Sequence, residues 1–248
     1  MEVHQHTHTP RKKWTHYFWE FLMLFLAVFC GFLAEYQLEH TIEHTREKEY
    51  IRSMREDAMT DTANLNYVLD RNRDRVIGLD SLVGLCYSFD GSAKSVRELY
   101  RLNDRYFNHP DIATLTERTL SQLKNAGGMR LIRNKRAVDS IIYYEQWQKK
   151  LTAQESWYFE YFDKPGPLSL DIFNFRYYRT DPITRKLTPI DSFPSVNLLK
   201  SDKKTITLYG NYMEQLKLII LYYIDLLEQT HFRALRLIQT LKKEYHLK

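Results

Sequence analysis

The sequence predicts a mainly α-helical protein: one N-terminal transmembrane helix that continues into a bundle of long helices, with one proline-rich loop or hairpin inserted. Three observations predict this fold class. Residues 21–34, FLMLFLAVFCGFLA, contain no polar side chain apart from Cys30. The 248 residues include only 8 glycines and 7 prolines, so few positions interrupt a helix. Close to the C-terminus, apolar residues recur in a heptad pattern.

The apolar stretch predicts a membrane-spanning helix over residues 17–37. Crossing the hydrocarbon core takes about 20 mostly apolar residues, and the extended range supplies them. Trp19 and Tyr36 stand near its two ends, as is typical of segments that cross the membrane–water interface. The alternatives are a buried core helix and a cleaved signal peptide. No A-x-A cleavage site follows the stretch, which favours an uncleaved anchor.

Charge on either side of the span predicts its orientation. Arg11, Lys12 and Lys13 precede the span, whereas Glu35 and Glu39 follow it. Because positively charged flanks stay in the cytoplasm, residues 1–16 are expected there as a polar tail, and residues 38–248 outside. The sequence therefore predicts a single-pass protein of the bacterial inner membrane with a periplasmic helical domain and the lipid bilayer as a partner.

One face of the predicted span carries Glu20, Leu24, Ala27, Gly31 and Ala34. Ala27 and Gly31 form a small-x-x-x-small pair, which lets two helix backbones approach closely within a membrane. This pattern predicts self-association through that face, and with it a homo-oligomer or a complex with other envelope proteins. The alternative is that alanine and glycine are simply frequent in membrane helices.

Composition indicates what kind of domain the rest of the chain forms. Hydrophobic residues make up 44% and charged residues 27%, which indicates a folded domain outside the span. The net charge is +5, with basic residues scattered among acids, so no nucleic-acid partner is predicted. The two cysteines, Cys30 and Cys86, are too few for a disulfide framework.

Periodic apolar residues predict the helices of this domain. Long helices are expected at about residues 38–87, 134–162 and 206–246, with Asn134 as an N-cap, and shorter ones ending near Phe107 and over residues 111–125. The first long helix has an apolar stripe at Ile51, Met54, Ala58, Leu65, Leu69, Asn72, Val76, Leu79 and Val83. The last has heptad positions at Leu216, Ile220, Tyr223, Leu227, Thr230, Ala234, Leu237 and Leu241. We expect these two stripes to pack against each other.

Residues 164–204 hold five of the seven prolines and are predicted to form a long loop. Residues 172–179 and 185–190 could pair as a small hairpin across Asp181-Pro182. Aromatic and arginine side chains mixed on an exposed loop favour a binding surface, with the alternative that the aromatics close the end of the bundle. The predicted binding surface is Phe173, Phe175, Arg176, Tyr178 and Arg179.

Histidines provide the candidate metal ligands. His40, Glu43 and His44 spell H-x-x-E-H, the inverted zinc-protease motif. The motif stands beside the predicted span and lacks a clear third ligand, so the sequence predicts no catalytic metal there. The tail repeats histidine at His4, His6, His8 and His16, a tract that binds metals loosely at most. Nucleotide-binding and nucleophile-elbow motifs are missing, so no cofactor is predicted.

A resemblance to a known group rests on residues 115–147, which contain LSQLKNAGGMRLIRNKRAVDSIIYYEQ. The matching positions are Leu123, Lys124, Gly127, Leu131, Ile132, Asn134, Lys135, Ile141 and Tyr144. Together with a basic tail and a single apolar helix, this passage resembles single-pass membrane proteins widespread in Bacteroidota. The organisation covers most of the chain, the passage about a tenth of it. The resemblance implies an envelope location and supplies no activity or site.

These observations predict a non-enzymatic, membrane-anchored helical protein of the bacterial envelope that acts as a scaffold or as a subunit of a complex. The alternative is a sensory or ligand-binding module that works through a partner, with a pocket lined by the aromatic residues 157–162. The two differ in one feature: a receptor needs a pocket in which charged groups converge among aromatic side chains. An enzyme is the least favoured class.

Overall fold

The structure is a computed structural model that describes residues 14–108, 110–125, 127–180, 183 and 187–247. The chain divides into two units, Met1–Glu49 and Tyr50–Lys248. Helix α1 (Trp14–Ser88) contributes to both, and the other elements belong to the second unit. The histidine-rich tail up to His8 lies outside the described residues.

In the first unit, α1 carries the apolar stretch. It is the one helix among the described residues that is long and apolar enough to cross a membrane, and none of that stretch is buried within the chain. Phe21, Phe25 and Phe29 stack on one another along the helix, with ring centroids 6.2 and 5.8 Å apart. The predicted N-terminal helix is therefore present, and its apolar side chains make a candidate membrane span.

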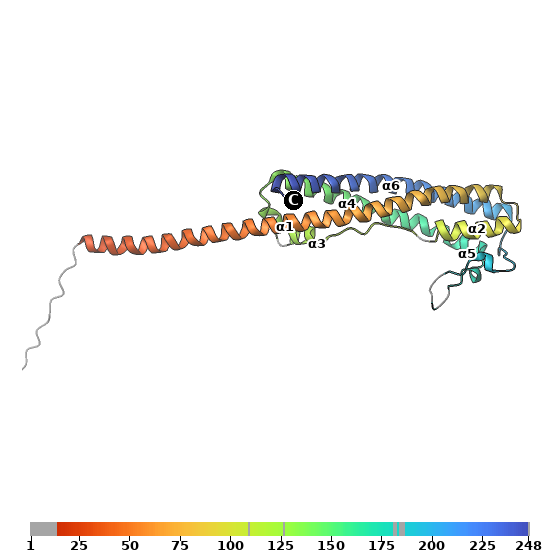
Figure 1. Cartoon of the computed structure of the whole chain (residues 1–248), viewed down its shortest axis with the longest axis horizontal. Helices are drawn as coiled ribbons and strands as arrows, with labels where there is room; N and C mark the ends of the chain where they lie inside the picture. Colours follow the sequence, from red (N-terminus) through yellow and green to blue (C-terminus); the bar gives the residue numbers. More distant parts are fainter. Residues whose placement is uncertain (1–13, 109, 126, 181–182, 184–186, 248) are drawn as a thin grey trace, which may run out of the picture. The chain divides into compact units, whose positions relative to one another are not determined.

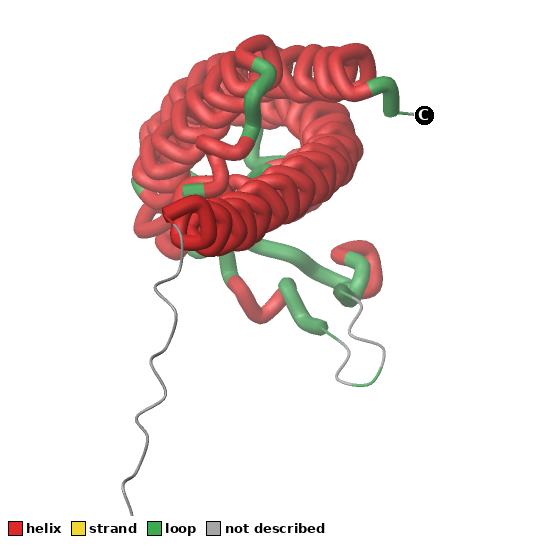
Figure 2. The backbone as a smooth tube through the Cα atoms, turned by 90° about the vertical axis from the view of Figure 1, so that its left-hand side faces the viewer, coloured by secondary structure: helices red, strands yellow, loops and turns green. Residues whose placement is uncertain are grey.

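The second unit is a helical bundle built on α1 from Tyr50 onwards, α4 (Lys135–Asp163) and α6 (Lys203–Tyr245). Figures 1 and 2 show these long helices side by side. Ion pairs join Asp80 to Lys217 and Arg73 to Glu228, so α1 and α6 run antiparallel. The predicted pairing of the first and last long helices is confirmed.

The predicted apolar stripes form the core. Each of the eight heptad positions of α6 is buried, and so is the α1 stripe apart from the half-buried Val76. Gly210 permits a close approach of α1 and α6, because a Cβ there would lie 2.7 Å from the Cβ of Cys86. The helix termini follow local sequence as well: Asn134 caps α4 as predicted, accepting a hydrogen bond of 3.1 Å from the Ala137 backbone.

The short elements are α2 (Ala93–Tyr106), α3 (Arg118–Asn125) and α5 (Gly166–Ile172), with 3₁₀ turns at Gly128–Leu131, Phe175–Tyr177 and Ile190–Ser192. The predicted helix over residues 111–125 is wrong in its first half, because α3 begins only at Arg118. Residues 111–117 are extended, and side chains of α1 and α6 accept hydrogen bonds from their backbone N–H groups.

The proline-rich segment also differs from the expected hairpin. Within the described residues it contains α5, two 3₁₀ turns and a single antiparallel bridge between Thr180 and Leu187, but no strand. Asp181 and Pro182, the predicted turn, lie outside the described residues. The segment packs along α2 through side-chain contacts and does not form the ladder of backbone hydrogen bonds that a hairpin needs.

Candidate functional site: a pocket beside helix α2

A pocket of about 480 Å³ lies between α2 and a second wall formed by Tyr177, Tyr178 and residues 187–191. This volume is within the range of small-molecule sites, about 300–1,000 Å³. Its lining combines tyrosines, aliphatic residues and charged groups: Glu98, Tyr100, Arg101, Leu102, Asp104, Arg105, Tyr106, Tyr177, Tyr178, Leu187, Thr188, Pro189, Ile190 and Asp191. The pocket therefore has the mixture of aromatic and charged groups expected of a recognition site.

Helix α2 supplies one wall because its two faces differ. Val96, Leu99 and Asn103 are buried against the bundle, and the pocket takes Arg101 and Arg105 from the opposite side of the helix. Ser92 begins the helix by accepting a hydrogen bond from the Ser95 backbone, 3.2 Å long. The cap and the buried face together fix which charged side chains reach the pocket.

Two arginines hold the opposite wall in place. Arg97 donates hydrogen bonds to the carbonyl oxygens of Ile190 and Phe193, at 2.9 and 2.8 Å. Arg101 forms ion pairs with Glu98, at 3.0 Å, and with Asp191 across the pocket. Because guanidinium groups offer several donors, Arg97 fastens two points of the irregular segment to α2, and Arg101 fastens one, Asp191.

Tyr100 supports the floor of the pocket. Its hydroxyl donates to the Asn197 carbonyl oxygen at 3.1 Å and accepts from the Asn174 N–H at 2.8 Å. Burial raises the pKa of Tyr100 to about 12. Its ring meets those of Phe173, Tyr177 and Tyr178 at centroid distances of 5.1 to 5.5 Å. Because the Tyr100 hydroxyl is neutral and both donates and accepts a hydrogen bond, its role is structural.

The predicted binding surface is divided by the structure. Phe173 is fully buried, so its assignment to an exposed surface is wrong: the ring packs on Tyr100 and Tyr209. Tyr178 is half-buried and lines the pocket, with its hydroxyl accepting a hydrogen bond from Asn103 at 2.9 Å. The exposed members are Phe175, Arg176 and Arg179. The alternative, aromatics that pack against the bundle, describes Phe173 and Tyr178.

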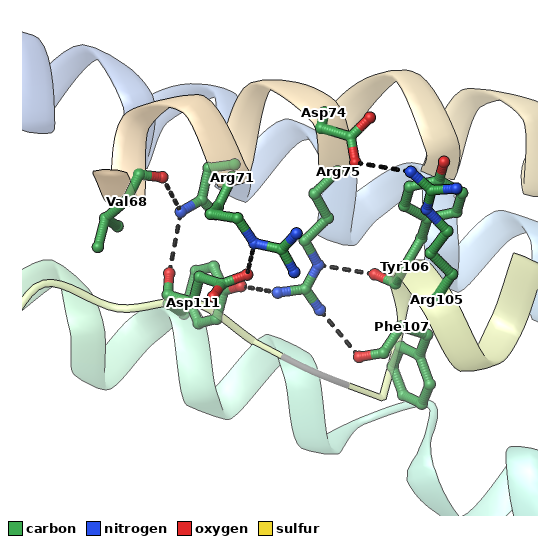
Figure 3. A network of polar contacts seen from close by, with 10 residues as sticks. Val68, Arg71, Asp74, Arg75, Arg105, Tyr106, Phe107 and Asp111 are labelled. Atoms are coloured by element: carbon green, nitrogen blue, oxygen red, sulfur yellow. Dashed lines mark hydrogen bonds and ion pairs between the residues drawn. The ribbon is translucent and has the colours of Figure 1, made fainter. Parts of the chain in front are cut away.

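Behind the pocket, a buried arginine joins three elements (Figure 3). Arg75 of α1 donates to the carbonyl oxygens of Tyr106 and Phe107, at 2.7 and 2.9 Å, and to the Tyr158 hydroxyl of α4. Burial lowers the pKa of Arg75 and raises that of Tyr158 to about 12. Arg75 is 3% exposed, so these hydrogen bonds, rather than water, stabilise its charge.

The same face of α1 also contacts Asp111, which follows α2, and Arg105, which lines the pocket. Asn72 donates to the carbonyl oxygens of Val68 and Asp111, both at 2.9 Å, and Arg71 pairs with the Asp111 carboxylate at 3.3 Å. Asp74 pairs with the pocket residue Arg105 at 3.6 Å. One turn of α1 therefore holds both the end of α2 and the start of the extended segment.

Two acids of α1 fasten residues 116–119. Asp57 accepts from the Thr119 N–H at 3.0 Å and pairs with Arg118 at 2.7 Å. Asp61 accepts from the Thr116 N–H at 2.7 Å and from the Tyr144 hydroxyl at 2.6 Å. Burial raises the pKa of Asp61, because little water remains to stabilise its charge.

The other groups singled out from the sequence lie elsewhere. Among residues 157–162, Tyr158 belongs to the Arg75 network and Trp157 is 57% exposed, and none of the six lines the pocket beside α2. The thiol of Cys86 is buried, which raises its pKa to about 12 and keeps it protonated at neutral pH.

In the first unit, His44 Nδ1 lies 3.3 Å from the Glu47 carboxylate. No group of three or more histidine, cysteine or acidic side chains among the described residues is arranged to hold a metal ion. That His40 and His44 bind no catalytic metal stays a prediction. Glu20, Leu24, Ala27, Gly31 and Ala34 share one face of α1, as helical spacing requires.

Sequence reasoning missed the pocket walls and the Arg75 network. The sequence did indicate some of the buried polar contacts of α1, because the polar residue Asn72 falls in its apolar stripe and Asp61 interrupts that stripe. No family model, curated protein or solved structure matches this chain. The resemblance of residues 115–147 to Bacteroidota membrane proteins therefore stays a prediction.

Proposed function

We propose that this protein is a membrane-anchored, non-enzymatic module of the bacterial envelope, which serves as a scaffold or as a subunit of a complex. The observation that carries the proposal is the apolar stretch of α1. Its side chains are unburied within the chain, although exposing so many large apolar groups to water is costly. A bilayer removes that cost, and basic residues before the stretch favour a cytoplasmic N-terminus.

The chemistry of the bundle supports a structural role. Asp57, Asp61 and Arg75 are buried and bonded to backbone or tyrosine groups, which suits the fastening of segments. A protonated Cys86 thiol is a poor nucleophile. These residues stabilise a fixed shape, as a scaffold needs.

The experiment is extraction of membranes with alkaline carbonate. We expect the full chain to stay in the membrane pellet and a variant lacking residues 1–49 to be released. Proteins that co-elute with the full chain after mild detergent solubilisation then identify the complex. Release of the full chain by carbonate would contradict the proposal.

A second candidate function is ligand binding in the pocket beside α2, because Arg101, Arg105 and Asp191 converge there among tyrosines. The test is a thermal-shift screen of small envelope metabolites against the parent. A ligand of this pocket should raise the melting temperature of the parent and of Lys149→Ala, whose side chain is exposed on α4, but not that of Arg101→Ala. An equal shift in all three proteins would place the ligand elsewhere.

A further inference from the structure

A groove of about 430 Å³ lies between the first turns of α4 and the last turns of α6. Three bases line it, Arg136, Arg236 and Lys243, together with two acids, Asp139 and Glu244. This surface is called the basic groove below, and all of its lining belongs to the second unit. Its volume is within the range of small-molecule sites.

Hydrogen bonds between the two helices explain why these residues meet. Asn134, which caps the start of α4, donates to the Glu244 carboxylate near the end of α6, at 2.8 Å. Further along, the Tyr223 hydroxyl lies 3.0 Å from the Glu155 carboxylate. The helices therefore run antiparallel, and the start of α4 lies beside the end of α6 (Figure 1).

Two bases on α6 have no acidic partner. Arg236 and Lys243 are seven residues apart, so they occupy one face of the helix two turns from each other. Within the part of the chain that the structure describes, neither of them forms an ion pair, and Asp139 forms none. Both bases are exposed, so their charges are available to a ligand.

The second acid of the groove is already engaged. Glu244 accepts the hydrogen bond from Asn134 and pairs with Arg136 at 3.2 Å. These two contacts lower the pKa of Glu244, in that order of size, so it stays ionised. With three bases and two acids, the lining carries one net positive charge.

The walls around the lining add further positive charge. Residues 133–143 and 232–247 contain seven bases, and their acids are Asp139 and Glu244 alone. One turn along the groove, the Arg233 guanidinium carbon lies 5.7 Å from the ring centroids of Tyr143 and Trp147, which bring no charge. The start of α4 and the end of α6 have opposite dipole charges, which offset each other. Side-chain charge therefore attracts an anion to this surface.

The donors of the basic groove suit an anion with several oxygen atoms. Arg236 and Lys243 each offer several N–H donors, and the exposed Gln239 amide between them offers more. Thr240 already donates its hydroxyl to the Arg236 carbonyl oxygen at 2.8 Å. A phosphate group can accept from several such side chains at once, and arginine matches its geometry. The groove is larger than one phosphate group, which leaves room for the substituent.

We propose that the basic groove binds a phosphate-bearing ligand, with Arg236 and Lys243 as its main contacts and Arg136 opposite them. Two sources offer this chemistry: the headgroup of an anionic phospholipid and a soluble phosphate compound. The site requires only the folded bundle, so it goes beyond the proposed scaffold function and does not rest on the membrane anchor.

The test is titration calorimetry of the full chain in a non-ionic detergent with two probes, dioctanoyl phosphatidylglycerol and inorganic pyrophosphate. At least one probe should bind the parent, and the double variant Arg236→Gln, Lys243→Gln should bind it at least about tenfold more weakly, because two charged donors are lost. Binding of phosphatidylglycerol alone identifies a lipid headgroup, and binding of pyrophosphate identifies a soluble phosphate compound. Binding of neither probe would overturn the proposal.

A matched double variant controls for net charge. Lys94→Gln, Lys204→Gln removes the same two positive charges from exposed positions near the starts of α2 and α6. It should bind each probe as the parent does. Equal weakening in the two double variants would mean that the probes respond to overall charge, and the basic groove would not be a site.

A third variant changes the affinity in the opposite direction. Asp139→Asn removes the unpaired acid of the groove and should tighten binding at least about threefold, because a like charge no longer repels the phosphate. Asp163→Asn, at an exposed position at the other end of α4, should leave the affinity unchanged. If the double variant of the groove does not fold, this comparison decides: equal affinities of Asp139→Asn and the parent would overturn the proposal.

Discussion

At the scale of single residues, the bundle depends on a few polar side chains of α1. Asp57, Asp61, Asn72 and Arg75 are each at most 3% exposed. Their partners include backbone groups of Tyr106, Asp111 and Thr119 and hydroxyls of α4. Because a buried polar group that loses its partner keeps its full desolvation cost, these positions should tolerate substitution poorly.

The first prediction concerns Arg75. Arg75→Met leaves the Tyr106 and Phe107 carbonyl oxygens without this donor and should destabilise the fragment from Glu47 onwards by about 3 kcal/mol. Arg71→Met is the matched control: Arg71 is 46% exposed, so its ion pair with Asp111 should contribute less than about 1 kcal/mol. Denaturant unfolding measures both, and equal losses would show that the Arg75 network does not stabilise the bundle.

The second prediction concerns pH and Asp61. Burial raises the pKa of Asp61 above the unfolded value near 3.8, so the folded state binds this proton more tightly. The free energy of unfolding should therefore fall as pH rises from the unfolded pKa through the folded pKa. Asp61→Asn lacks this titration. Its stability relative to the parent should rise over that pH range, as measured by urea unfolding at several pH values; a difference independent of pH would contradict the assignment.

At the scale of elements, each long helix has a buried face that periodicity predicts. The α6 heptad could be predicted from the sequence because residues on one face of a helix recur about every 3.6 residues, whatever the helix packs against. The form of residues 111–117 could not be predicted in this way. Their extended backbone depends on side chains of α1 and α6, and the local sequence does not indicate those partners. Phe173 was misplaced for the same reason, since a segment without a period does not indicate its buried side.

The third prediction tests the docking of α6. Ile220 is fully buried, so Ile220→Asp places an unpaired carboxylate in the core and should cost about 4 kcal/mol or more. Leu208→Asp is the control on the same helix, because Leu208 is 45% exposed. Thermal unfolding of the fragment from Glu47 onwards should show a lower melting temperature for Ile220→Asp alone. Identical melting of both variants and the parent would refute docking through this face. Lys217 is unsuitable as a control because it pairs with Asp80 and Glu214.

At the scale of the whole molecule, the chain combines a candidate membrane span with a helical bundle. Sequence predicted both because each depends on hydrophobic pattern alone. The pocket beside α2 could not be predicted from the sequence, since its walls come from α2 and from residues 177, 178 and 187–191, which only the tertiary fold brings together. None of the aromatic residues 157–162, which the sequence suggested as the lining of a pocket, lines the pocket beside α2.

The fourth prediction concerns topology. Because basic residues precede the apolar stretch, the bundle is expected outside the cytoplasm. A reporter enzyme that is active only in the periplasm, fused after Lys248, should be active. A fluorescent protein that matures only in the cytoplasm, fused at the same point, should be dark. The opposite pair of results would reverse the proposed orientation.

The ion pairs between α1 and α6 also bear on synthesis. Asp80 precedes Lys217 by 137 residues and Arg73 precedes Glu228 by 155. At translation rates of about 5–20 residues per second, α1 waits on the order of ten to thirty seconds for its partner helix to emerge. During this interval the nascent chain exposes Leu65, Leu69 and Leu79, all of which are buried in the finished protein. Chaperones that bind apolar segments are therefore expected on this chain before its last helix leaves the ribosome.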